Sequence, residues 1–335
     1  MTLVKLQQNG AIGELMLCSP KTLNALTHTD IQAVRSGLAR FEADATVRAI
    51  VIRSDSERAF CAGGDMKRIR EHILAKRFDD IERFFTDEYA LNLAISRCQK
   101  PYIALMNGIA MGGGLGISVH GHFRVVSENS RLAMPESRIG FFADVGASYF
   151  LPKLPHRAGY WLGLTSVSVK GHEALLVGLA THYIKSESFG ALQEELAARL
   201  LALDCDAPKE EMHNAVRSTL DAFSAPCPDD NFVTILAQRE QWFADNSLDA
   251  IQDRLAAATN AGDEDAAQLL ALLEAGSPYS ARSLMSLLEN ASNKTLQQCL
   301  ELELALGAEA VRYPDCAEGV RAVLVDKDQS PAWAR

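Results

Sequence analysis

The apolar residues in the first third of the chain alternate between two kinds of spacing. Short apolar runs at 13–18, 48–53, 103–109 and 123–127 are typical of buried strands. Between the first two runs, residues 27–44 place apolar side chains at helical offsets. Strands joined by helices predict an α/β core with βαβ crossovers.

The pattern changes from about residue 187 onward. Long amphipathic stretches predict helices at 187–204, 208–224, 230–243, 247–259, 263–275, 279–291 and 294–313. Prolines and glycines separate several of these stretches, and we find no internal repeat. The sequence therefore predicts a mixed α/β part over residues 1–200 and a helical C-terminal region over residues 201–335.

Residues 103–119 carry no charge and could be mistaken for a membrane span. The stretch is short for a span, contains Asn107, and has five glycines that would weaken an isolated helix. We expect a buried strand, a glycine turn and a buried helix instead, and no membrane partner.

The composition is that of an ordinary globular protein, with 335 residues and a formal net charge of −10. Because binding to a phosphate backbone requires clustered Lys and Arg, this acidic excess argues against a nucleic-acid partner. The seven cysteines lack metal-ligand spacing, which predicts reduced thiols and no metal site. The N-terminal residues show neither a secretory signal nor an Arg-rich transit peptide. We expect a cytoplasmic protein, or a mitochondrial matrix protein if the chain is a processed eukaryotic form.

Two glycine-rich segments follow predicted strands: FCAGGD at 60–65 and MGGGLG at 111–116. Glycines at a strand-to-helix turn let backbone N–H groups point at a ligand oxygen. The first segment alone favours the simpler interpretation, a tight turn in which Asp65 caps a helix. The three consecutive glycines of the second exceed what helix packing usually needs, which favours backbone donors there. Neither segment matches a dinucleotide-binding or P-loop fingerprint.

Glu136 and Asp144 lie in an apolar, glycine-punctuated segment. Two carboxylates at this spacing can converge on one pocket, and a buried carboxyl has the raised proton affinity that acid/base chemistry needs. The alternative for Glu136, which follows Pro135, is a place at a helix start where it favours the helix dipole. The residues by themselves leave both interpretations open.

Three motifs occur in a particular order and spacing. They are Ala62-Gly63-Gly64-Asp65, Asn107-Gly108-x-x-Met111-Gly112-Gly113-Gly114, and Pro135-Glu136 followed by Gly140 and Asp144-x-Gly146. Together they resemble the crotonase (enoyl-CoA hydratase/isomerase) superfamily. Further segments are similar to its 3-hydroxyisobutyryl-CoA hydrolase branch, namely residues 20–26, 98–101, 118–121, 151–154 and 319–331.

This resemblance implies a crotonase-like α/β spiral of ββα units, with residues 1–200 as the CoA-binding catalytic core and a helical C-terminal region that often mediates trimer contacts. It implies that the backbone N–H groups of Gly64 and Gly113 form an oxyanion hole for the thioester carbonyl. By the same resemblance, Ala62 and Met66 line the adenine of coenzyme A and Lys327 lies near its phosphates. The alternative for Lys327 is a solvated charge at a helix end. Coenzyme A is then part of the substrate, and no separate cofactor is expected.

The reaction is implied by one missing side chain. Hydratases of this superfamily present a glutamate two residues after the triple glycine, where this chain has Gly116. With Glu136 retained, and Asp144 where hydratases usually carry glycine, the resemblance implies hydrolysis of a short 3-hydroxyacyl-CoA, foremost 3-hydroxyisobutyryl-CoA in valine catabolism.

In that reaction Glu136 would be the nucleophile or the general base, and Asp144 would hold the substrate 3-hydroxyl or assist proton transfer. Two alternatives stay open: an enoyl-CoA hydratase/isomerase of the same fold, and a non-catalytic assembly protein.

Overall fold

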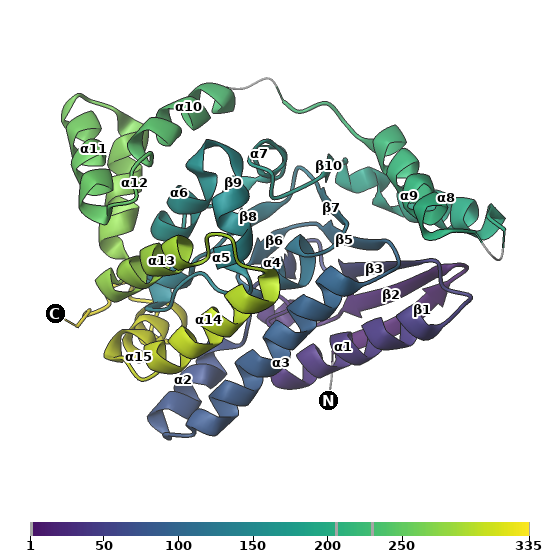
Figure 1. The fold of residues 1–335 in the computed structure, drawn as a ribbon, viewed down its shortest axis with the longest axis horizontal. Coiled ribbons are helices and arrows are strands. Elements are labelled where there is room, and N and C mark those ends of the chain that lie inside the picture. The colour runs from purple at the N-terminus through teal and green to yellow at the C-terminus, as the bar shows by residue number, and fades with distance from the viewer. Residues whose placement is uncertain (1–2, 205–206, 229–230, 335) are drawn as a thin grey trace. The chain divides into compact units, whose positions relative to one another are not determined.

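Figure 1 shows the computed structural model, which describes residues 3–204, 207–228 and 231–334. The chain forms two compact units, each assembled from separated stretches of sequence. Unit 1 comprises Met1–Gly64, Ala90–Leu132 and Val169–Asp229, and unit 2 comprises Asp65–Tyr89, Ala133–Ser168 and Asp230–Arg335. The division of the sequence between residues 200 and 201 stays a prediction.

The larger sheet belongs to unit 1 and has six strands in the order β1-β2-β3-β5-β7-β10. The strands are β1 (Val4–Asn9), β2 (Ile12–Leu17), β3 (Ala49–Ser54), β5 (Tyr102–Met106), β7 (Phe123–Val126) and β10 (His182–Tyr183). Only the β1–β2 pair is antiparallel among these described strands. Parallel strands need crossover connections, and the uniformly apolar runs predicted to be strands are the buried ones that such a sheet requires.

The smaller sheet has the order β4-β6-β8-β9, with β4 (Ala59–Cys61), β6 (Ile109–Met111), β8 (Arg131–Ala133) and β9 (Val169–Lys170). It corrects one prediction, because residues 103–109 are not a single strand. The chain leaves the larger sheet after Met106 and enters the smaller sheet at Ile109. Between them Gly108 has φ +80°, and a Cβ there would lie 2.5 Å from the carbonyl carbon of Arg58, so only glycine fits this turn.

Helices cover the larger sheet within unit 1, namely α1 (His28–Ala43), α4 (Gly113–Val119), α7 (Gly171–Leu176), α8 (Phe189–Ala202) and α9 (Lys209–Phe223). The predicted helix at 27–44 is confirmed, and Thr27 caps it in a reciprocal capping box with Asp30. Leu192, Leu196 and Leu200 of α8 share a buried cluster with apolar residues of β3, β5 and β7. The helical spacing in this stretch therefore serves to seal a sheet.

Unit 2 is almost entirely helical in its described residues. Its longer helices are α2 (Met66–Leu74), the first part of α3 (Phe78–Arg97), α6 (Ala158–Thr165), α10 (Phe232–Trp242), α11 (Leu248–Asn260), α12 (Glu264–Ala275), α13 (Pro278–Asn290), α14 (Leu296–Ala310) and α15 (Pro314–Val320). Shorter turns of helix are η2 (Glu136–Ile139), α5 (Ala147–Phe150), η3 (Leu151–Lys153), η4 (Pro155–Arg157) and the π-helix η6 (Arg321–Val325). The predicted helices between 230 and 313 are confirmed to within a few residues at their ends.

The centre of unit 2 is α6, where every residue is buried. Trp161 is fully buried there, and the Arg239 guanidinium of α10 lies 4.6 Å from the centre of its ring. Arg239 also forms a two-pronged ion pair with Asp265 of α12, with bonds of 2.8 and 2.7 Å. These contacts join the predicted helices α10 and α12 to α6, a helix that was not predicted from the sequence.

Candidate active site

Two glycine loops, residues 61–64 and 111–114, lie against each other in unit 1. An ideal Cβ on Gly114 would stand 2.3 Å from the carbonyl oxygen of Cys61, so no side chain fits between the loops at that point. An ideal Cβ on Gly63 would lie 3.4 Å from the backbone nitrogen of Gly113. The glycines therefore bring the backbones of the two loops into direct contact.

Gly64 and Gly113 both lie within this contact. Gly113 is buried and is the first residue of α4, while Gly64 is partly buried. No backbone hydrogen bond recorded across residues 3–204, 207–228 and 231–334 uses the N–H of either glycine as its donor. Two N–H groups without a backbone acceptor in the described part of the chain, on adjoining loops, can bind a ligand oxygen.

Asn24 binds β4, the strand that leads into the first glycine loop. Its side-chain amide donates to Ser54 Oγ at 2.7 Å, to the Ala59 carbonyl at 3.2 Å and to the Phe60 carbonyl at 3.0 Å. Asn24 is buried and has φ +56°, a conformation that asparagine tolerates better than most residues. Sequence reasoning placed Asn24 in a family-like segment without a role, because its partners are 30 to 36 residues away.

Glu136 and Asp144 come together in unit 2 with side chains that lie far away in sequence. Both are buried, with 7% and 5% of their surface exposed. Glu136 begins η2 directly after Pro135, as the helix-start interpretation requires. The Tyr89 hydroxyl donates to Asp144 Oδ2 at 2.7 Å, whereas Glu136 Oε2 is buried with no partner in the described part of the chain.

Burial dominates the proton affinities of these side chains. It raises the pKa of Asp144 from 3.8 to about 7, against the opposing effect of the Tyr89 hydrogen bond. Burial and the charge of Asp144 raise the pKa of Glu136 well above its usual value, and they do the same for Glu88. Buried carboxyls that raise one another's pKa do not all ionise near neutral pH. The group therefore retains at least one proton, which is available for acid/base chemistry.

Glu303 of α14 completes this set of buried carboxyls. Burial raises the pKa of Glu303 to about 8, against hydrogen bonds from Ser148, and the charge of Asp144 adds to the rise. We call Glu88, Glu136, Asp144 and Glu303 the acidic cluster. Every member belongs to unit 2.

Sequence reasoning missed Glu88, Tyr89 and Glu303. The sequence did carry a signal for two of them. Glu88 lies on the apolar face of α3 with Ile81, Phe84 and Phe85. Glu303 lies on the apolar face of α14 with Leu296, Cys299 and Leu300. A charged residue on an apolar helical face is a candidate for a buried functional group.

The three side chains assigned to coenzyme A are placed as follows. Ala62 is in the first glycine loop of unit 1, and Met66 opens α2 in unit 2 behind Asp65, which caps that helix. Lys327 is in unit 2, exposed after η6, with φ +61°. Within unit 2, α2 packs on α15 and η6, and Arg70 Nε donates to the Ala317 carbonyl at 3.0 Å.

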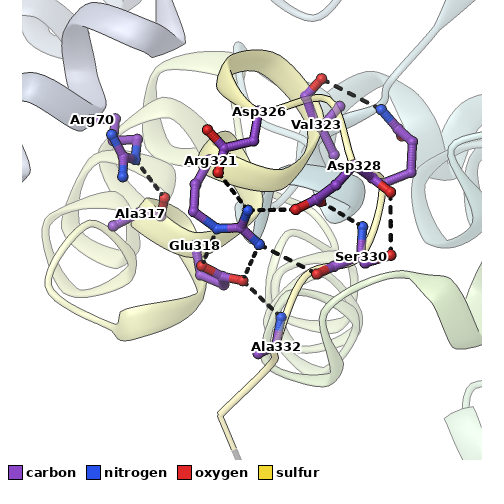
Figure 2. Close-up of polar contacts among 10 residues, drawn as sticks. Arg70, Ala317, Glu318, Arg321, Val323, Asp326, Asp328, Ser330 and Ala332 are labelled. Atoms are coloured by element: carbon purple, nitrogen blue, oxygen red, sulfur yellow. Dashed lines mark hydrogen bonds and ion pairs between the residues drawn. The ribbon is translucent and has the colours of Figure 1, made fainter.

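Arg321 organises the segment that carries Lys327 (Figure 2). Its guanidinium makes two 2.8 Å hydrogen bonds to Glu318 and single bonds to Asp326 and Asp328 at 2.7 and 2.6 Å. These two aspartates flank Lys327 in the chain. Lys327 therefore lies between two residues whose side chains are both bound to Arg321.

A family model described as enoyl-CoA hydratase/isomerase matches residues 12–335 of this chain. The chain belongs to the enoyl-CoA hydratase/isomerase family.

Among its curated relatives, the mitochondrial 3-hydroxyisobutyryl-CoA hydrolase of Bos taurus is 40% identical over 334 residues, covering 98% of this chain and 83% of the relative. The enzyme of the same name from Homo sapiens is 40% identical over 332 residues, with the same coverage.

Solved structures confirm the crotonase-like α/β fold. A carnitinyl-CoA dehydratase from Mycobacterium thermoresistibile superposes with a TM-score of 0.87 at 30% identity, over 99% of this chain and 91% of that one. An enoyl-CoA hydratase from Rhodobacter sphaeroides 2.4.1 gives the same TM-score and identity, over 100% of this chain and 93% of that one. Within the described residues, none of the helices has the length and apolar character needed to cross a bilayer.

Proposed function

We propose that this protein hydrolyses the thioester of 3-hydroxyisobutyryl-CoA, releasing the free acid and coenzyme A. The observation that carries the proposal is the match, at 40% identity and across 98% of the chain, to hydrolases named for this substrate. Gly116 at the second catalytic glutamate position of hydratases supports hydrolysis over hydration. The acidic cluster supplies the buried, proton-sharing carboxyls that thioester cleavage needs.

In the proposed reaction the N–H groups of Gly64 and Gly113 stabilise the oxyanion that forms on the thioester carbonyl. Glu136 acts by one of two routes. As nucleophile, its carboxylate attacks the carbonyl carbon, the C–S bond breaks, and water then hydrolyses the mixed anhydride. As general base, it takes a proton from the water that attacks the same carbon. In both routes the departing thiolate takes up a proton.

We assign to Asp144 the proton-transfer role or the contact with the substrate 3-hydroxyl. A pKa of about 7 lets Asp144 exchange a proton readily at neutral pH. The Tyr89 hydrogen bond fixes its carboxyl plane, which suits either task.

A panel of acyl-CoA thioesters, assayed with the wild type and with Glu136→Gln, tests the proposal. We expect thiol release from 3-hydroxyisobutyryl-CoA and a loss of about 100- to 10,000-fold in Glu136→Gln, since this change removes the base or nucleophile but keeps its shape. Comparison with 3-hydroxypropionyl-CoA measures the effect of one methyl group, worth about 1–3 kcal/mol in an apolar pocket. A change of enoyl absorbance without thiol release would contradict hydrolysis and support the hydratase/isomerase alternative.

In a single turnover in heavy-oxygen water, label in the Glu136 carboxyl identifies the nucleophilic route, whereas label in the product acid alone is compatible with both routes, because water can also attack the anhydride on its acyl side. Water that attacks the anhydride on its enzyme side leaves the label in the Glu136 carboxyl, which peptide mass analysis detects. In the general-base route the label enters only the product acid. The matched control is Glu136→Gln under the same conditions.

Further parts of the proposal concern location and assembly. We propose an acyl-CoA as the substrate partner, no separate cofactor or metal, and a homo-oligomer such as a trimer. We propose the cytoplasm or, for a processed eukaryotic chain, the mitochondrial matrix as the site of action, and the word mitochondrial in the names of the curated relatives supports the second. Size-exclusion chromatography with light scattering measures the assembly state.

A further inference from the structure

Glu303 is a fully buried carboxyl that binds the turn following Asp144. It lies on α14 with 0% of its surface exposed. One oxygen accepts the Gly146 N–H at 2.7 Å, and the other accepts the Ser148 N–H at 2.9 Å and the Ser148 hydroxyl at 2.6 Å. One buried carboxyl thus accepts hydrogen bonds from three donors that lie 155 to 157 residues away in the sequence. A fully satisfied contact of this kind indicates a specific tertiary interaction.

The turn held by Glu303 has an unusual backbone. Val145 has φ +53°, in the left-handed region where β-branched residues are outliers, and Gly146 has φ +84°. Strained backbone of this kind persists only where surrounding contacts determine it, and it concentrates at functional sites. The Ala147 N–H also donates to the Asp144 carbonyl at 2.9 Å. The strained residues Val145 and Gly146 therefore lie inside a turn that begins at Asp144.

The two sides of Asp144 are therefore fixed by different elements. On the side-chain side, Tyr89 of α3 donates to its carboxyl at 2.7 Å. On the backbone side, Glu303 of α14 holds residues two and four positions further along the chain. Loss of the second support would let Val145 relax toward negative φ and would turn the Asp144 carboxyl away from Tyr89.

We propose that Glu303 is a positioning residue for the reaction: it locks the turn 144–148 and thereby sets the orientation of the Asp144 carboxyl. This inference rests on the proposed role of Asp144. Glu303 itself need not contact the substrate.

The electrostatic surroundings support a coupling between the two carboxyls. Asp144 is near Glu88, Tyr89 and Glu136, and Glu303 is near Asp144, Tyr89 and Cys299. The cations that influence Cys299 are Lys153 and Lys294. The charge of Asp144 raises the pKa of Glu303, so the two carboxyls titrate as coupled groups.

The test is Glu303→Gln, assayed for kcat, KM and the pH dependence of kcat. A glutamine keeps the shape but turns an N–H₂ group toward one of the three donors, so the turn loses support. We expect kcat to fall about 10- to 100-fold with KM changed less than about threefold, because misplacing a reacting group slows the step more than it weakens binding. We also expect the ionisation of Asp144 to move to higher pH, because a displaced Asp144 carboxyl loses the Tyr89 hydrogen bond that lowers its pKa.

Asp315→Asn is the matched control for a structural effect. Asp315 is likewise fully buried in unit 2 and accepts the Ser277 hydroxyl at 2.6 Å and the Ala334 N–H at 2.7 Å. We expect this variant to unfold at lower temperature but to keep the wild-type pH profile of kcat. A Glu303→Gln variant that behaves like it, folded and with an unchanged pH profile, would overturn the inference.

Two more variants, Ser148→Ala and Asp144→Asn, test the positioning role and the role of Asp144 separately. If Glu303→Gln does not fold, Ser148→Ala removes only the hydroxyl donor, and we expect a smaller fall in kcat, about two- to fivefold, with a shift of the pH profile. A wild-type profile in Ser148→Ala would then refute the positioning role. Asp144→Asn tests the proposed function separately: full activity there would contradict the role of Asp144, whatever Glu303→Gln shows.

Discussion

The glycine loops of unit 1 present backbone groups, whereas the acidic cluster of unit 2 presents side chains. In the loops, chemistry depends on the absence of side chains, since a Cβ on Gly114 would lie 2.3 Å from the Cys61 carbonyl oxygen. In the cluster, it depends on burying charged side chains that water would otherwise stabilise. A backbone donor can be misplaced but not titrated, while a buried carboxyl responds to pH. Substitutions in the glycine loops should therefore lower activity at every pH, whereas substitutions in the acidic cluster should change how activity depends on pH.

The largest effect is expected in the glycine loops, from Gly114→Ala. The added methyl group must displace the backbone of residue 61, so the N–H groups of Gly64 and Gly113 lose their spacing. Loss of one oxyanion donor typically costs about 100- to 1,000-fold in kcat, and we expect a loss of that size with no change in the pH profile.

Gly190→Ala is the control, because a Cβ on Gly190 of α8 meets nothing within 4 Å. We expect it to keep full activity and to gain up to about 1 kcal/mol in the free energy of unfolding, from helix propensity. Equal activity in Gly114→Ala and Gly190→Ala would contradict the importance of the loop contact.

In the acidic cluster, Asp144→Asn is expected to lower kcat about 100-fold yet to stabilise the protein at alkaline pH. The folded-state pKa of Asp144, about 7, lies above its usual 3.8, so the stability it contributes is complete below about pH 4 and is lost as the pH rises through about 7. Asparagine removes this titration. At pH 8 we expect a free energy of unfolding about 1–3 kcal/mol above that of the wild type, measured by urea denaturation across pH 4–8. If the free energy of unfolding depends on pH in the same way in the wild type and in Asp144→Asn, the raised pKa of Asp144 is contradicted.

A smaller and more specific effect is expected from Tyr89→Phe. The Tyr89 hydrogen bond lowers the pKa of Asp144, so its removal should raise that pKa and move the pH profile of kcat upward. We expect kcat at neutral pH to fall about tenfold.

Tyr102→Phe provides the comparison in unit 1, where a buried tyrosine hydroxyl donates to the Ile117 carbonyl at 2.9 Å. It should cost about 1 kcal/mol in stability and leave the pH profile unchanged. Similar profiles for the two tyrosine variants would refute the contribution of Tyr89.

The smallest effect concerns the exposed Lys327. If it contacts a coenzyme phosphate, Lys327→Ala should raise KM about two- to fivefold at low salt, and the difference should shrink as salt screens the charges. Lys209→Ala, another exposed lysine, is the control and should leave KM unchanged. Equal KM values for the two variants at low salt would favour a solvated charge for Lys327.

Local pattern was sufficient for most of the fold. The helix at 27–44 and those between 230 and 313 follow from apolar spacing and capping residues, because both act within a few turns of chain. The exception is 103–109, where apolar character continues across a turn between two sheets. Only Asn107 and Gly108 interrupt it, and a periodicity argument cannot tell one buried strand from two.

Some parts of the candidate site could likewise be predicted from the sequence, and others could not. The glycine motifs and the pair Glu136 and Asp144 are close in sequence, so they could be identified from the chain alone. The partners of Tyr89, Asn24 and Glu303 could not, because each lies tens to hundreds of residues away.

The amino-acid sequence was thus enough to predict most element types, to show the family resemblance and to name candidate groups for the proposed thioester cleavage. The tertiary structure decided which carboxyls are buried together, which donors restrain Asp144, and how far burial raises its pKa. The physical reason is that spacing and capping are short-range, whereas desolvation and charge–charge repulsion depend on whatever the fold brings within a few ångströms.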